Sequence, residues 1–128
     1  MKKIVVASDS FKGSVSSIEV AECAKLAIHK VFPDCEVVKI PVGDGGEGTV
    51  ETLITAMGGE AVSCVVHDPL MRSVEATYGI LGDNRTAVIE MATASGLTLV
   101  PVSERNPLRT TTYGTGELIK DAMDRLSL

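Results

Sequence analysis

The sequence predicts an α/β protein: a Rossmann-like β-α-β-α-β lobe with parallel strands, followed by the start of a second α/β domain that contains a β-hairpin and a helix. Short β-branched runs alternate with helical patterns through the first half of the chain, and this order requires parallel strands joined by crossover helices. Two runs of alternating polarity around a tight turn follow, which is typical of a hairpin. An amphipathic helical pattern occupies the last residues.

The first lobe is expected to span residues 1–67. Residues 3–7 are a short β-branched run that predicts a buried strand. Ser16 and Glu19 form a capping-box pattern, which begins a helix of about sixteen residues that the Pro-Asp pair at 33–34 ends. The other elements predicted for this lobe are a strand over residues 35–42, a helix from Thr49 to Met57 and a strand over residues 60–67.

The second lobe begins where the pattern changes, near residues 67–72. Residues 73–81 and 86–92 alternate as two strands around the turn at 82–84, which predicts a hairpin. Residues 93–112 lack a regular period apart from one short helical turn. The hairpin is therefore the central feature expected of this lobe.

The helix predicted for residues 113–126 carries an apolar face that needs a covering element. The members of this face are Leu118, Ile119, Ala122, Met123 and Leu126. The helix either packs back on the hairpin or is covered by a following strand, which α/β folds usually supply. We favour the second arrangement, in which residues 68–128 are the N-terminal part of a larger domain and the chain is a fragment of a longer protein.

Composition and charge exclude several classes of protein. The 128 residues carry 17 acidic and 12 basic side chains, and a net charge of −5 argues against a nucleic-acid partner. No apolar run approaches the roughly 20 residues of a membrane helix, and the first residues lack the apolar stretch of a secretory signal. The three cysteines fit neither a disulfide framework nor a zinc pattern, which favours a reducing cytoplasm.

The loop at residues 43–48 is rich in glycine and stands between a predicted strand and a predicted helix. Gly43, Gly45 and Gly48 match the G-x-G-x-x-G spacing of dinucleotide-binding loops. Asp68 lies about 20 residues further on, where such loops have a ribose-binding acid. A dinucleotide-binding domain of an oxidoreductase is therefore a serious alternative.

Two carboxylates in the same loop argue against a bare pyrophosphate. Asp44 and Glu47 would repel an anion by roughly a kcal/mol each, unless a metal ion lies between them and the anion. Backbone N–H donors beside carboxylates suit a hydroxylated acid, or a phosphate bridged by Mg²⁺.

The polar loop from Ser8 to Ser14 follows the first strand at its carboxyl end, where open α/β sheets bind ligands. Asp9 is a candidate proton acceptor or metal ligand, and Lys12 is a candidate partner for a carboxylate or a phosphoryl group. Lys12 precedes its glycine, so the loop is not a Walker A loop. Because both loops follow strands of one parallel sheet, we expect them to share an edge.

A third polar stretch, residues 106–117, leads into the last helix. Its threonines and glycines predict either an anion site or an ordinary helix cap. They are Thr110, Thr111, Thr112, Gly114 and Gly116. Glu90 interrupts an apolar strand, so its carboxylate either faces solvent or points into a cleft. Arg72 and Arg109 are further cations near these loops.

Four stretches together resemble the glycerate kinase type-1 family, in an order and spacing that match across essentially the whole chain. They are Ser8–Ser14, Pro41–Thr49, Ala87–Ala92 and Arg105–Glu117. Ser8 stands where the family more often has a proline and Gly43 where an alanine is common, and neither change removes a functional group. A further glycine-rich stretch of the family has no counterpart in these residues.

The resemblance implies an enzyme that phosphorylates D-glycerate to phosphoglycerate with ATP and Mg²⁺ in the cytoplasm. Family members have two α/β domains with the active site between them. D-glycerate is then the small-molecule partner, with no nucleic acid and no membrane involved, and the remaining C-terminal part of the kinase completes the enzyme. A homo-oligomer is possible, and the phosphorylated hydroxyl is left open.

Phosphoryl transfer depends on positioning and on charge neutralisation. We assign Asp44 to the substrate or Mg²⁺–phosphate site, with Asp44 or Glu47 as the metal ligand. Lys12 would neutralise the glycerate carboxylate or the transferring phosphoryl group, and Asp9 would act as base or metal ligand. The expected binding residues are Ser10, Gly43, Gly45, Gly46, Gly48, Thr49, Thr110, Thr111, Thr112, Gly114 and Gly116. The alternatives are the dinucleotide domain and a non-catalytic module that binds hydroxy acids or anions.

Overall fold

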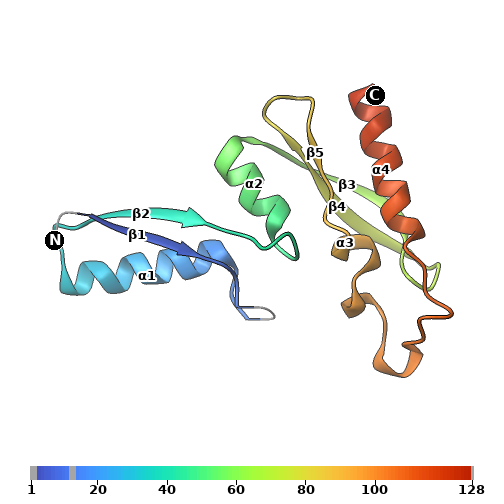
Figure 1. The fold of residues 1–128 in the computed structure, drawn as a ribbon, viewed down its shortest axis with the longest axis horizontal. Helices are drawn as coiled ribbons and strands as arrows, with labels where there is room; N and C mark the ends of the chain where they lie inside the picture. The colour runs from blue at the N-terminus through green and yellow to red at the C-terminus, as the bar shows by residue number, and fades with distance from the viewer. Residues whose placement is uncertain (1–2, 12–13, 128) are drawn as a thin grey trace. The chain divides into compact units, whose positions relative to one another are not determined.

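The computed structural model describes residues 3–11 and 14–127 and divides the chain into two compact units, one ending at Thr52 and one beginning at Leu53 (Figure 1). The first unit contains β1 (Lys3–Ser8), α1 (Ser17–Val31), β2 (Glu36–Pro41) and the start of α2 (Thr49–Met57). The second contains β3 (Gly59–His67), β4 (Ser73–Leu81), β5 (Ala87–Val88), α3 (Ala92–Ser95), the 3₁₀ turns η1 (Leu97–Leu99) and η2 (Val102–Glu104), and α4 (Tyr113–Leu126). The predicted α/β class is confirmed.

The first unit is built on a parallel strand pair with a helical crossover, as the sequence predicts. β1 and β2 pair in parallel from Lys3 opposite Glu36 to Ser8 opposite Pro41, and α1 connects them. The predicted capping box begins α1: Ser16 Oγ accepts a hydrogen bond from Glu19 N at 3.2 Å, and Ser16 N donates to Glu19 Oε2 at 2.9 Å.

The third strand does not join this parallel sheet, so that part of the prediction is wrong. β3 pairs antiparallel with β4, from Gly59 opposite Leu81 to His67 opposite Ser73. A short turn closes the pair, and closing a short loop costs less chain entropy than a crossover to a distant sheet. The two compact units accordingly divide at Thr52, whereas the predicted lobes divide after residue 67.

The turn between β3 and β4 is held by one buried carboxylate. Asp68 Oδ1 accepts hydrogen bonds from Leu70 N at 2.7 Å and Arg72 N at 2.9 Å, and Oδ2 accepts one from Arg72 Nε at 2.9 Å. Burial raises the pKa of Asp68, but these hydrogen bonds together outweigh it and hold the pKa below its ordinary value. Met71 takes a positive φ of 63° inside this turn.

The predicted hairpin of β4 with a following strand forms, but its second strand is shorter than residues 86–92. β5 consists of Ala87–Val88 and pairs with β4 through Val88 opposite Gly79 and Ala87 opposite Ile80. The strand ends because the Glu90 carbonyl accepts hydrogen bonds from Thr93 N at 3.2 Å and Thr93 Oγ1 at 2.9 Å, which start a helical turn.

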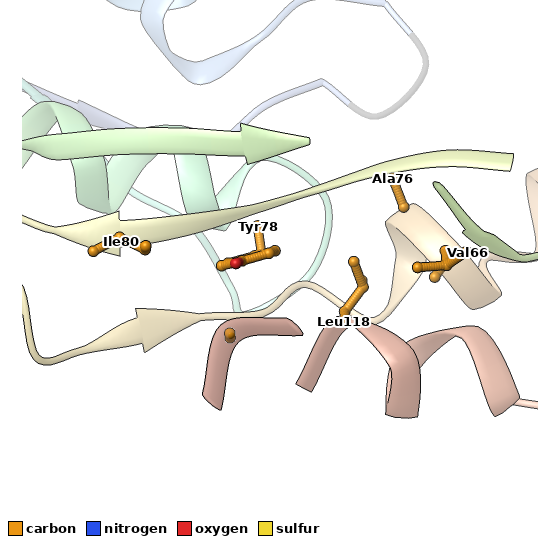
Figure 2. Packing of buried hydrophobic residues seen from close by; sticks show 7 residues of the cluster. Val66, Ala76, Tyr78, Ile80 and Leu118 are labelled. Carbon is orange, nitrogen blue, oxygen red and sulfur yellow. The ribbon is translucent and has the colours of Figure 1, made fainter. Parts of the chain in front are cut away.

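The core of the second unit lies between the sheet β3–β4–β5 and the helices α3 and α4. Figure 2 shows Leu118 of α4 pointing toward Val66, Ala76 and Tyr78 of the strands. The Tyr78 hydroxyl donates a hydrogen bond to Asp121 Oδ2 at 2.7 Å, and burial together with this bond raises the pKa of Tyr78 to about 12. Among the described residues, no helix is long and apolar enough to cross a membrane.

This packing corrects the expectation that a further strand covers the last helix. Leu118 is 0 % exposed and Ala122 is 3 % exposed, because the hairpin sheet covers them. Ile119 and Met123, on the edge of the same apolar face, stay 46 % and 47 % exposed. The helix therefore packs back on the hairpin, which corrects the expected strand cover and does not bear on the expectation that the chain is part of a longer protein.

Leu118→Ala should lower the free energy of unfolding by about 2–5 kcal/mol, because it leaves a cavity at a fully buried position. Ile119→Ala is the matched control on the neighbouring, half-exposed position and should cost less than about 1 kcal/mol. Urea unfolding of both variants measures the difference. Equal losses in the two variants would contradict the packing of α4 on the sheet.

Candidate functional site

The first two polar loops leave the same edge of the parallel sheet, as the sequence predicts. Ser8, the last residue of β1, stands opposite Pro41, the last residue of β2. Val42 N continues the pairing by donating to the Ser8 carbonyl oxygen at 3.3 Å. The parallel register therefore brings the two loops together at the carboxyl ends of their strands.

The first loop turns sharply after Asp9. Asp9 Oδ1 accepts a hydrogen bond from Ser10 N at 2.7 Å. Phe11 and Val15 then form an antiparallel bridge around the loop tip, with Phe11 N donating to the Val15 carbonyl at 2.9 Å. Lys12, the predicted partner for a carboxylate or phosphoryl group, lies outside the described residues. The Ser10 hydroxyl oxygen is buried and has no hydrogen-bond partner among the described residues.

The second loop depends on glycine at two positions and on one carboxylate. Gly45 and Gly48 have φ values of 92° and 88°, a conformation that side chains disfavour. Asp44 Oδ1 accepts a hydrogen bond from Gly46 N at 2.8 Å, which closes the turn between them. Thr49 begins α2, and its buried hydroxyl oxygen, like that of Ser10, has no partner among the described residues.

A pocket of about 320 Å³ joins the two loops within the first unit. Ser10 of the first loop and Glu47 and Gly48 of the second line it. Its other lining residues are Phe11, Ser14, Val15, Ser16, Ser17 and Glu51. Asp9 and Asp44, the predicted catalytic carboxylates, are not in the lining; Asp9 directly precedes Ser10, and Asp44 lies three residues before Glu47. The pocket thus offers carboxylates and hydroxyls to a ligand.

Sequence reasoning missed Glu51, which lines the pocket from the first turn of α2. The four-residue spacing of Glu47 and Glu51 gives no helical signal, because Glu47 precedes α2 and Gly48 between them has a φ of 88°. No group of three or more metal-ligating side chains forms among the described residues. Mg²⁺ is commonly held by one or two carboxylates with substrate phosphates and water, and Glu47 and Glu51 fit that mode.

The third polar stretch lines a different cavity, of about 570 Å³, in the second unit. Thr110, Thr111 and Thr112 line it, whereas Gly114 and Gly116 do not, and that the threonines hold an anion stays a prediction. Sequence reasoning missed three polar side chains of this lining: Ser95, Arg105 and Asn106. That this stretch joins the first two loops in one site stays a prediction.

Gly114 has a packing role in the structure. A Cβ at this position would lie 1.8 Å from the His67 carbonyl oxygen, so glycine lets α4 approach the end of β3. Glu117, one turn along α4, accepts a hydrogen bond from His67 N at 2.8 Å, and its carboxylate lies 3.0 Å from His67 Nδ1. Burial raises the pKa of Glu117, but the hydrogen bonds from His67 together outweigh burial and hold the pKa below its ordinary value.

Asp68 and Arg72 prove to be structural, and Glu90 is buried. Asp68 is buried in the β3–β4 turn, so it is not the ribose-binding acid of a dinucleotide site. The dinucleotide alternative therefore loses its ribose-binding acid and the third parallel strand and keeps only the glycine spacing of the loop at residues 43–48. Arg72 pairs with Asp68 and lies 3.5 Å from Glu104, so it braces the turn. Glu90 is 7 % exposed, which excludes the solvent-facing interpretation.

Known proteins match the chain over nearly its whole length. The sequence pattern of the glycerate kinase family matches residues 4–126. The glycerate kinase of Haemophilus influenzae is 53% identical over 122 residues, which are 95% of this chain and 32% of that protein. The glycerate 2-kinase of Escherichia coli is 52% identical over 122 residues, again 95% of this chain and 32% of that protein. The chain thus spans about a third of the length of these curated relatives.

A solved structure agrees with the fold. The crystal structure of a protein assigned as glycerate kinase 2 from Salmonella typhimurium LT2 matches with a TM-score of 0.81 at 49% sequence identity. The match covers 97% of this chain and 33% of that one. The similarity therefore extends over both compact units of the chain.

Gly114→Ala should lower the free energy of unfolding by about 1–3 kcal/mol or more, because the added methyl group collides with the His67 carbonyl. Gly116→Ala is the matched control: its Cβ meets open space, and alanine in a helix is favoured over glycine by about 0.5–1 kcal/mol. Thermal unfolding compares the two variants. A neutral Gly114→Ala would show that α4 does not approach β3 closely.

Glu117→Gln should lose less stability in acid than the wild type. The pKa of Glu117 is lower in the folded chain than its ordinary 4.5, so its contribution is fully present above 4.5 and is lost as the pH falls through the folded value. The difference in unfolding free energy between wild type and variant should therefore shrink as the pH falls below 4.5. Urea titrations at several pH values measure it, and a difference independent of pH would contradict the Glu117–His67 contact.

Proposed function

The chain belongs to the glycerate kinase family, and on that premise we propose that it carries part of the active site of an enzyme that transfers a phosphoryl group from ATP to D-glycerate. The observation that carries the proposal is the match of residues 4–126 to the family, with relatives of about half-identical sequence that bear the kinase name. Because the Escherichia coli relative is named glycerate 2-kinase, we propose that the 2-hydroxyl of D-glycerate accepts the phosphoryl group in the enzyme of this chain as well.

The pocket at the edge of β1 and β2 supports a role in binding the acceptor. Glycerate carries hydroxyls that need acceptors and a carboxylate that needs donors. Glu47, Glu51 and the serine hydroxyls supply acceptors, and the glycine-rich loop supplies backbone N–H groups at the start of α2. The Ser10 hydroxyl, which lines the pocket, is buried without a partner among the described residues and is consistent with a ligand that hydrogen-bonds there.

In the proposed reaction, the acceptor hydroxyl loses its proton to a base, its oxygen bonds to the γ-phosphorus, and the bond from that phosphorus to ADP breaks. We keep Asp9 as the candidate base or metal ligand and Lys12 as the cation for the glycerate carboxylate or the phosphoryl group. Asp44 orients the loop through Gly46 and adds negative charge beside it. Thr110, Thr111 and Thr112 would hold a second anion.

Bound Mg²⁺ would neutralise phosphate charge and help to align the phosphoryl group. Glu47 and Glu51 would hold it, since both line the pocket, and Asp44 is the alternative ligand. We also propose a cytoplasmic location, consistent with three cysteines that form no disulfide, and leave a homo-oligomer as possible.

A chimeric enzyme tests the proposal. The relatives have two thirds of their length outside the match, so the experiment supplies that length by replacing the matching third of the Haemophilus influenzae glycerate kinase with this chain. We expect the chimera to convert D-glycerate and ATP to 2-phosphoglycerate, identified by ³¹P NMR. Binding of glycerate without turnover would instead favour a non-catalytic hydroxy-acid module.

Asp44→Asn in the chimera should lower kcat/KM by about 100-fold or more, because it removes charge from the loop while its side-chain oxygen still accepts from Gly46 N. Asp34→Asn, at an exposed position after α1, is the matched control and should leave kcat/KM unchanged. Steady-state kinetics with D-glycerate measure both. Full activity of Asp44→Asn would remove Asp44 from the active site.

A further inference from the structure

Among the described residues, the lining of the cavity in the second unit contains one cation and no acid. Its volume is about 570 Å³, within the range of sites that enclose drug-sized ligands. Arg105 is the one charged side chain among the described residues that line it. Thr112, the N-cap residue of α4, brings the positive end of the helix dipole to the same lining. The cavity is therefore suited to an anionic ligand.

Two hydrogen bonds hold the Arg105 guanidinium in place and leave other N–H groups for a ligand. Its Nε donates to the Val100 carbonyl at 3.2 Å and its Nη2 donates to the Leu97 carbonyl at 3.4 Å. These two acceptors are neutral, and no described carboxylate forms an ion pair with Arg105, so its charge is not neutralised within the described part of the chain. A guanidinium has five N–H donors, and the remaining ones suit phosphate oxygens.

Apolar residues form another part of the lining, close to Arg105, which donates to the carbonyls of Leu97 and Val100. Pro69, Leu97, Val100 and Pro107 contribute to it; Val100 is 3 % exposed, and Leu97 is 64 % exposed. A three-carbon hydroxy acid has no apolar part that these residues could bury and would leave most of the volume unfilled. A ligand that has both a phosphate group and a flat apolar part fits the polar and the apolar residues of this lining.

We propose that this cavity binds a nucleoside phosphate, with the phosphates on Arg105 and the threonines and the base against Leu97, Val100 and Pro107. This inference rests on the proposed function, which makes ATP the phosphoryl donor, and it assigns the ATP site to the second unit. Thr111 and Thr112 hydroxyls and the Arg105 guanidinium bind the phosphates, while the apolar residues select a nucleoside over inorganic phosphate.

Calorimetric titration of the chain with ADP, pyrophosphate and D-glycerate tests the proposal. We expect ADP to bind more tightly than pyrophosphate. Binding that depends on Arg105 is the part of the affinity that Arg105→Gln removes, and by this measure both ligands should bind more tightly than D-glycerate. Amide chemical shifts of the wild-type chain should move with ADP at Gly96 and Thr110–Thr112, which needs no variant. Absence of ADP binding, or shifts elsewhere only, would overturn the proposal.

Two variants separate the phosphate contact from the base contact. Arg105→Gln should weaken ADP and pyrophosphate by about tenfold or more, since it removes charge-assisted hydrogen bonds. Leu97→Gln, at an exposed position, should weaken ADP by severalfold and leave pyrophosphate unchanged. Arg109→Gln is the matched control, an exposed arginine of the same segment outside the lining, and should change neither.

Thermal unfolding of Arg105→Gln checks that the loss is not one of folding, because Arg105 also bridges two carbonyls. Tighter Arg105-dependent binding of D-glycerate than of ADP would overturn the proposal and make the cavity a hydroxy-acid site. The chimeric kinase assay is independent of these titrations. An active chimera without ADP binding in the cavity refutes only this inference, whereas ADP binding with an inactive chimera refutes only the proposed function.

Discussion

The parallel register of β1 and β2 is the constraint on which the candidate site depends. Because Ser8 lies opposite Pro41, the loops that follow both strands begin at one edge and meet in one pocket. A shift of the register by one residue would turn the side chains of one strand to the other face of the sheet. The capping box at Ser16 reinforces the arrangement, since it begins α1 directly after the first loop.

In the second unit, hydrogen bonds and close packing hold the threonine segment Thr110–Thr112 in place. Asp68 fixes the turn that ends β3, and the Pro69 carbonyl accepts a hydrogen bond from Thr111 N at 3.0 Å. Gly114 and Glu117 then hold the first turn of α4 against His67. The threonines that line the cavity are thus tied to the β3–β4 hairpin from both sides.

The sequence predicted the α/β class and the parallel pair from the alternation of strand and helix patterns, and the capping box and the hairpin from residues close together in the chain. It missed the antiparallel partner of β3, because period-2 and apolar patterns do not state strand direction. It assigned Asp68 and Gly114 to ligand binding, although hydrogen bonds to Arg72 and the approach to His67 account for them. Glu51 and Arg105 were missed because only the folded chain brings them to a pocket. The catalytic roles of Asp9, Lys12 and Asp44 stay predictions.

We propose that the pocket joining the first two loops binds the hydroxy acid that is phosphorylated. Amide chemical-shift mapping of the chain with D-glycerate tests it most directly. We expect the amide shifts to move at Ser10 and at Glu47–Thr49, with no comparable change in β3 and β4. Changes confined to the second unit, or changes at the glycine-rich loop with NADH and none with D-glycerate, would contradict it.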